Sequence, residues 1–121
     1  MNALVIDDSK VMRTIQKNGL GPLGFTEVAE AADGAEGLAE VAKKMPELIL
    51  LDWNMPVMDG IEFITKFREM GHKTPVIMVT TEAEKSRVIT AIKAGVSNYL
   101  MKPFTPEQLK ERVEQTLSKA A

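Results

Sequence analysis

The fold is decided by the stretch Leu48-Ile49-Leu50-Leu51-Asp52-Trp53-Asn54-Met55-Pro56-Val57-Met58-Asp59-Gly60. A continuous apolar run ends at Asp52, breaks into a loop at Pro56 and restarts at Asp59. Such a run is typical of a strand that is buried on both faces of a parallel sheet. Asp52 is therefore expected at the carboxyl end of a central strand, where open α/β sheets bind their ligands.

Short apolar runs alternate along the whole chain with longer amphipathic segments. Strands are predicted at 3–6, 27–31, 48–52, 76–80 and 98–101, and helices at 9–17, 35–44, 60–70, 83–94 and 106–119. Strict alternation of this kind favours βαβ units and a parallel sheet. Because the crossovers between parallel strands are right-handed, a doubly wound α/β sandwich is the expected topology.

Local signals mark several helix boundaries. Asp33 with Glu36, and Thr105 with Gln108, match the capping box that starts a helix. An Asn-Gly pair opens the glycine-rich segment 18–24 and predicts an early or irregular end of the first helix. The rest of that segment is expected to be a loose surface connection.

Composition and charge narrow the class of protein. The 121 residues suit one domain, spanning 1–121, with no room for an output domain. A net charge of -2 and scattered basic residues argue against a nucleic-acid or anionic-membrane surface. The absence of cysteine excludes disulfides and thiolate chemistry. Without a leader or a long apolar segment, a cytoplasmic location is expected, and the mixed-charge surface favours a monomer.

Three carboxylates follow two of the predicted strands. Asp7 and Asp8 come after the first strand and Asp52 ends the third, so they converge if these strands are neighbours. A divalent cation would relieve their mutual repulsion, and oxygen ligands of this kind suit Mg²⁺. The alternative is structural: Asp8 caps the first helix while Asp7 is solvated.

A hydroxyl and a lysine complete the group. Thr80 closes the fourth predicted strand and Lys102 follows the fifth. Together they suit a ligand with several anionic oxygens, such as a phosphoryl group. Either residue alone would have an ordinary structural role, but five such side chains at four strand ends predict a phosphoryl site.

With these residues in view, the chain resembles the receiver domain of two-component response regulators, and in particular its stand-alone chemotaxis type. The resemblance runs from the first strand to the last helix and is densest at 5–9, 52–60, 78–80 and 99–104. It implies a flavodoxin-like (βα)5 fold with the strand order 2-1-3-4-5.

The resemblance also implies roles for the site residues. Asp52 would be the phosphoacceptor. Asp7 and Asp8 would hold Mg²⁺ together with Asp52 and the backbone carbonyl of Asn54, and Lys102 would pair with the phosphoryl oxygens. The protein would catalyse only its own phosphorylation and dephosphorylation, as a switch rather than a turnover enzyme.

Two further residues would transmit the signal. Thr80 would hydrogen-bond the phosphoryl group, and Tyr99 would move inward as Thr80 is drawn toward it. The Lys102–Pro103 peptide would be cis and would place the lysine; proline lowers the cost of that isomer to about 0.5–1 kcal/mol.

Three residues near the acceptor are expected to tune how long the signal lasts. Asn54 and Glu82 lie two residues after Asp52 and Thr80, where they could orient a hydrolytic water. This pairing resembles the rapidly self-dephosphorylating chemotaxis type. Thr81 departs from the small residue usual there, and its β-branched side chain predicts somewhat slower turnover.

The implied partners are a histidine kinase, a downstream target such as a flagellar motor switch protein, and a possible phosphatase. The target would bind the face formed by the fourth helix, fifth strand and fifth helix. Two alternatives remain: a phosphorelay carrier that passes phosphate to a histidine phosphotransfer protein, and a Mg²⁺-dependent phosphohydrolase acting through an aspartyl phosphate. The second is disfavoured because Asn54 stands where such enzymes carry a carboxylate. The single histidine, His72, is expected to be exposed in a loop.

Overall fold

The computed structural model describes residues 1–82 and 84–120. Strands and helices alternate along this part of the chain. They are β1 (Asn2–Ile6), α1 (Lys10–Leu20), the 3₁₀ turn η1 (Gly21–Leu23), β2 (Glu27–Ala31), α2 (Gly34–Lys43), β3 (Leu48–Leu51), α3 (Gly60–Glu69), β4 (Val76–Thr80), α4 (Lys85–Ala94), β5 (Asn98–Met101) and α5 (Pro106–Ala120).

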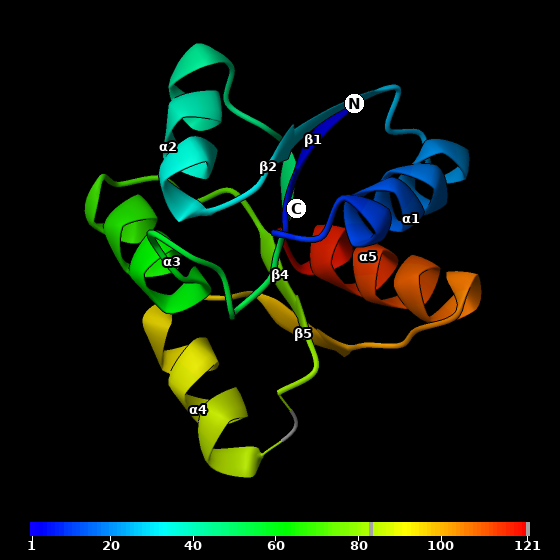
Figure 1. Cartoon of the computed structure of the whole chain (residues 1–121). Coiled ribbons are helices and arrows are strands. Elements are labelled where there is room, and N and C mark those ends of the chain that lie inside the picture. The colour runs from blue at the N-terminus through cyan, green and yellow to red at the C-terminus, as the bar shows by residue number, and fades with distance from the viewer. Residues whose placement is uncertain (83, 121) are drawn as a thin grey trace.

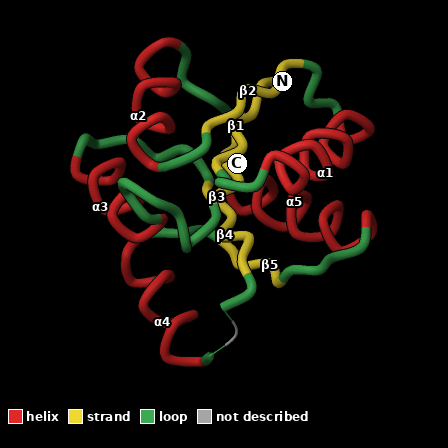
Figure 2. Tube along the Cα trace, in the orientation of Figure 1, coloured by secondary structure: helices red, strands yellow, loops and turns green. Residues whose placement is uncertain are grey.

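The strands form one parallel sheet in the order β2-β1-β3-β4-β5, which confirms the predicted flavodoxin-like topology. Helices α1 and α5 cover one face of the sheet, and α2, α3 and α4 cover the other (Figures 1 and 2). Ile6 at the end of β1 pairs in register with Leu51 at the end of β3. The residues that follow these two strands are therefore neighbours at one edge of the sheet.

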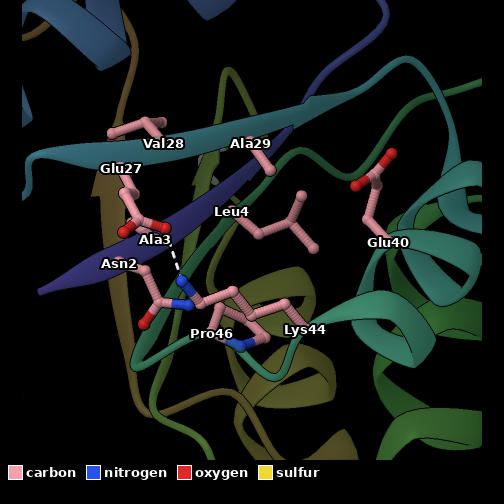
Figure 3. A pocket seen from close by; sticks show the side chains of 9 residues that line it. All are labelled: Asn2, Ala3, Leu4, Glu27, Val28, Ala29, Glu40, Lys44 and Pro46. Carbon is pink, nitrogen blue, oxygen red and sulfur yellow. Dashed lines mark hydrogen bonds and ion pairs between the residues drawn. The ribbon is translucent and has the colours of Figure 1, made fainter.

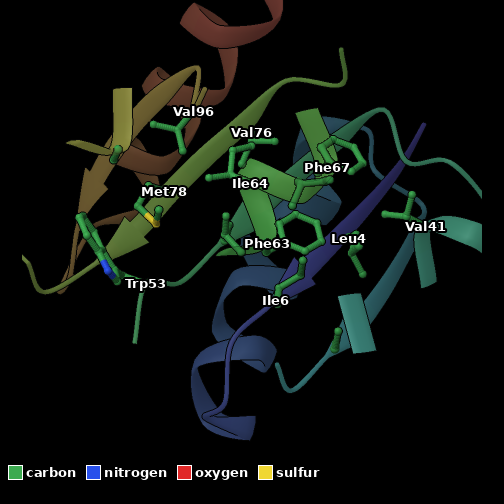
Figure 4. Close-up of a cluster of buried hydrophobic side chains, with 14 of the residues drawn as sticks. Leu4, Ile6, Val41, Trp53, Phe63, Ile64, Phe67, Val76, Met78 and Val96 are labelled. Carbon is green, nitrogen blue, oxygen red and sulfur yellow. The ribbon is translucent and has the colours of Figure 1, made fainter. Parts of the chain in front are cut away.

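A separate hydrophobic core lies on each side of the sheet. Figure 4 shows the core beneath α2, α3 and α4, with Phe63 and Phe67 of α3 among its side chains. Ile49 and Leu51 of β3 also belong to this core. The core beneath α1 and α5 includes Leu48 and Leu50 of the same strand. All four side chains are fully buried, because successive residues of a strand point to opposite faces. The prediction that this strand is buried on both faces is confirmed.

The first helix does not end early, but its end is irregular, which is the other outcome that the sequence predicted. Helix α1 continues through Gly19 to Leu20, whose side chain is fully buried. A Cβ atom at Gly19 would lie 2.6 Å from Cδ2 of Leu109, so this glycine allows α1 and α5 to approach closely. The left-handed conformation occurs five residues later, at Gly24 with φ of 98°. The segment after α1 is thus an ordered 3₁₀ turn rather than a loose connection.

Other boundaries agree with the predictions to within one or two residues. Thr105 and Gln108 form a reciprocal capping box, in which each backbone N–H donates to the other side chain, at 2.9 and 3.1 Å. Asp33 accepts from the N–H of Glu36 at 2.8 Å and caps α2. The predicted start of the fourth helix at residue 83 lies outside the described residues. No helix in the described ranges has the length and apolar character that crossing a bilayer requires.

A polar notch marks the amino ends of β1 and β2, opposite the end where the predicted site residues lie. It has a volume of about 320 Å³ and is crossed by an ion pair between Lys44, which follows α2, and Glu27 of β2 (Figure 3). Both side chains are largely exposed. The pair covers the exposed end of an edge strand and takes no part in the site described next.

Candidate functional site

The sheet delivers the predicted site residues to one edge, here called the carboxyl-end rim. Asp7 and Asp8 follow β1, Asp52 follows β3, Thr80 closes β4 and Lys102 follows β5. One carboxylate oxygen from each of the three aspartates lies within 4.8 Å of the others. The sequence-based expectation that these carboxylates meet is therefore met by the geometry.

Lys102 lies between two of the carboxylates. Its Nζ donates to Oδ2 of Asp7 at 2.7 Å and to Oδ2 of Asp52 at 3.2 Å. The lysine side chain is only 12% exposed, so both ion pairs are largely shielded from water. The Lys102–Pro103 peptide bond is cis, as the resemblance implied.

Asp7 and Asp8 differ sharply in environment although they are adjacent. Asp7 is fully buried, and its Oδ1 accepts from the N–H of Ser9 at 2.9 Å. Its Oδ2 accepts from Nε2 of Gln16 at 3.2 Å, in addition to Lys102. Asp8 is exposed. The alternative roles for this pair are wrong, because Ser9 caps α1 through its Oγ and Asp7 is not solvated.

Asp52 is nearly buried, and its surroundings shift the pKa of its carboxylate. It is 8% exposed, and its Oδ1 accepts from the N–H of Trp53 at 2.8 Å. Burial raises the pKa of Asp52 above its ordinary value; Lys102 opposes this shift and the Asp7 carboxylate adds to it. Asp7 and Asp52 thus share one ammonium group, and the third carboxylate, that of Asp8, leaves the cluster with an excess of negative charge. Hard oxygen donors with excess charge fit a divalent cation such as Mg²⁺.

Glu82 connects Thr80 and Asn54 near the rim with Tyr99 of β5. Its N–H donates to Oγ1 of Thr80 at 3.3 Å, and its Oε1 accepts from Nδ2 of Asn54 at 3.0 Å. Its carbonyl oxygen accepts from the Tyr99 hydroxyl at 2.5 Å. The Tyr99 ring is 8% exposed and packs in the core beneath α3 and α4. The ring therefore already lies inward, with its hydroxyl bonded to protein rather than to water.

Two features near the acceptor were not predicted from the sequence. Gln16 was missed, although a polar residue between Met12 and Leu20 on the inward stripe of α1 is a readable signal. Val57 adopts a left-handed φ of 67° in the loop after Asp52, which is unusual for a β-branched residue.

His72, which was expected to be exposed, is partly buried, and the centroid of its ring lies 4.9 Å from that of Phe67.

Thr81 is exposed and borders a groove beside the rim. The groove has a volume of about 430 Å³, and Lys102, Pro103 and Phe104 line it together with Met12 and Ile15 of α1. The side chain of Thr81 thus stands at an entrance to the lysine. This position is compatible with the predicted effect on access.

Comparison with known proteins decides the family. Residues 3–114 match the family described as the response regulator receiver domain. The chain belongs to the response regulator receiver domains. Receiver-domain relatives with curated names include chemotaxis protein CheY1 of Helicobacter pylori, 47% identical over 97% of both chains. The chemotaxis protein CheY homolog of Campylobacter jejuni is 49% identical over 97% of this chain and 92% of its own length.

Solved receiver structures agree with this assignment. Chemotaxis response regulator CheY4 of Vibrio cholerae superposes with a TM-score of 0.88 at 36% identity, covering 95% of this chain and 97% of its own. A CheY-like receiver domain from Methanospirillum hungatei gives a TM-score of 0.88 at 31% identity, covering 98% and 94% of the two chains. The predicted resemblance to chemotaxis receivers is confirmed.

Proposed function

We propose that this chain is a single-domain response regulator that accepts a phosphoryl group on Asp52 from a histidine kinase and thereby switches binding to a chemotaxis target. The observation that carries this proposal is the Lys102 Nζ, which bridges Asp7 and Asp52 at 2.7 and 3.2 Å in a cluster of three carboxylates. The family and the CheY relatives give it independent support.

The acceptor chemistry follows from the contacts at the rim. An Asp52 carboxylate oxygen attacks the phosphorus of a phosphohistidine, forming an O–P bond as the N–P bond breaks, and the histidine nitrogen leaves with the bond electrons and takes up a proton. Repulsion between anions opposes this attack, so opposing charge must be in place beforehand. Lys102 already donates to Asp52 and can follow the charge onto the phosphoryl oxygens.

Mg²⁺ would be held by Asp7, Asp8, Asp52 and the backbone carbonyl of Asn54. Thr80 and Tyr99 would change position when Asp52 is phosphorylated. When bound, Mg²⁺ would neutralise charge on the phosphoryl oxygens and on the carboxylates. Asp7 and Asp8 fit this role because their oxygens converge with that of Asp52.

The target surface is the groove between α4, β5 and α5. It has a volume of about 460 Å³ and is lined by Tyr99, Val88 and Arg112 among others. Tyr99 reaches Glu82, which in turn contacts Thr80. A shift of Thr80 toward a phosphoryl group would therefore disturb contacts that border this groove. A flagellar motor switch protein is the proposed target, and a phosphatase is a further proposed partner of the cytoplasmic, monomeric protein.

The direct test is incubation of the purified chain with a small-molecule phosphodonor and Mg²⁺, followed by intact mass measurement. We expect one added phosphoryl group on the wild type and none on Asp52→Asn. Asp59→Asn is the matched control, because the Asp59 carboxylate accepts from the Glu62 N–H at 2.9 Å as the cap of α3, whereas Lys102 donates to Asp7 and Asp52. Equal labelling of Asp52→Asn, or loss of labelling in Asp59→Asn alone, would contradict the acceptor assignment.

The lifetime of the adduct separates the switch from the relay carrier. After removal of the donor, loss of phosphate within minutes supports a self-resetting chemotaxis switch. An adduct that lasts for hours supports the relay, since a carrier gains nothing from spontaneous loss. The hydrolase alternative is tested with the same samples: continuous release of phosphate from unrelated monoesters would support it.

A further inference from the structure

Gln16 places a buried neutral amide against a carboxylate of the rim. The side chain comes from the middle of α1 and is 1% exposed. Its Nε2 donates to Oδ2 of Asp7 at 3.2 Å. Polar groups are costly to bury unless they are hydrogen-bonded, and an apolar residue would complete the stripe formed by Met12 and Leu20. The hydrogen bond to Asp7 therefore accounts for a polar residue at this buried position.

Asp7 needs a hydrogen-bond donor that stays in place when Lys102 turns toward the phosphoryl group. Its Oδ2 has two side-chain donors, Gln16 and Lys102, and Lys102 is shared with Asp52. In the proposed function Lys102 turns toward the phosphoryl group, so that its hold on Asp7 weakens. Gln16 remains in position, because it is fixed on a helix that is capped at Ser9 and packed against the sheet.

The neutrality of this donor matters as much as its position. A lysine or arginine at this place would orient Asp7 but would also cancel its charge and repel a divalent cation. An amide fixes the rotamer of the carboxylate and leaves its negative charge available. Partners that orient a metal ligand in this way commonly affect metal affinity about 10–100-fold.

We infer that Gln16 is a positioning residue for Mg²⁺ binding, which acts by holding the Asp7 carboxylate in the orientation that the cation requires. This inference rests on the proposed function, because it assumes that Asp7 is a metal ligand. It assigns to α1 a role in the metal site that the rim residues alone do not show.

The test is a Mg²⁺ titration of the full chain, monitored by the fluorescence of Trp53, whose backbone N–H donates to Asp52, and by thermal unfolding with and without Mg²⁺. Gln16→Met keeps the length and volume of the side chain and removes the donor; Gln16→Leu is a second variant in case the first folds poorly. Thr116→Val is the control, because Thr116 is also a buried polar residue, 2% exposed, that donates to Arg112 of α5 at 2.6 Å.

We expect Gln16→Met to raise the Mg²⁺ dissociation constant about tenfold, while Thr116→Val leaves it unchanged. Phosphorylation at saturating Mg²⁺ should stay within about twofold of the wild type, since Gln16 acts on binding of the cation. A dissociation constant within about twofold of the wild type for both Gln16 variants would overturn the inference while leaving the proposed function intact. A wild type that does not bind Mg²⁺ would overturn both.

Discussion

Replacing Lys102 by methionine probes the two largely buried ion pairs at the carboxyl-end rim. The change keeps an unbranched side chain of similar length and removes the ammonium group that, among the described residues, is the only one paired with Asp7 and Asp52. Two nearly buried carboxylates would then face one another without a counter-charge. Because Asp7 is fully buried and Asp52 is 8% exposed, water cannot replace the lysine easily.

Breaking a buried ion pair by removing one partner typically costs about 3–5 kcal/mol. We expect a loss of about 3 kcal/mol for Lys102→Met, at the lower end of this range, because Asp7 keeps two other donors and Asp52 keeps a backbone donor. For a domain of this size each kcal/mol lowers the melting temperature by about 4 °C, so the expected shift is about 12 °C.

The assay is urea denaturation of both proteins in metal-free buffer at neutral pH. Lys44→Met is the matched control, since it breaks an ion pair with Glu27 in which both side chains are more than half exposed. Exposed pairs contribute about 0–1 kcal/mol, so this variant should unfold close to the wild type. If Lys102→Met were no less stable than Lys44→Met, the claim that the rim lacks positive charge would be refuted.

Three further predictions concern single residues. Burial raises the pKa of Asp52 above its ordinary value of 3.8. The free energy of unfolding of the wild type should therefore fall as the pH rises from 3.8 through the raised pKa, and then level off. Asp52→Asn removes this fall, so urea denaturation without metal should find the variant more stable than the wild type at neutral pH but not in acid. Thr81→Ala opens the groove beside Lys102 and should speed both phosphorylation and loss of phosphate, measured by intact mass; unchanged rates would contradict the steric argument. Val57→Gly removes a left-handed valine that is 81% exposed and should stabilise the fold by about 1 kcal/mol in thermal unfolding, whereas a loss of stability would show that the valine is not strained.

Much of the site could be predicted because it depends on the sheet alone. Apolar runs such as residues 48–51 identify buried strands, and in a parallel sheet the next residue must lie at the carboxyl edge. Asp7, Asp52 and Lys102 are placed by this rule, without any knowledge of side-chain contacts. Capping boxes are equally local, so the start of α5 directly after its capping residue Thr105 could also be predicted.

What could not be predicted depends on contacts between distant segments. Gly19 resembles a helix end in sequence, but its place against Leu109 of α5 keeps it within α1. The inward Tyr99 is held by a backbone carbonyl, that of Glu82, and a backbone acceptor leaves no trace in the residue types. Gln16 carried a signal that was missed, since a polar residue inside an apolar stripe requires a buried partner.

The division of the interior by the sheet has a consequence for how such a protein can change. In the described part of the chain, the two buried clusters share no residue. Thr80 points to the same face of the sheet as Val76 and Met78, because alternate residues of a strand share a face. Val76 and Met78 belong to the cluster that contains Tyr99. A movement of Thr80 at the rim therefore affects first the packing on the side of α3 and α4. Substitutions in the cluster beneath α1 and α5 can therefore accumulate, or be designed, without repacking the side chains around Tyr99. The two halves of the interior can diversify separately within one small domain.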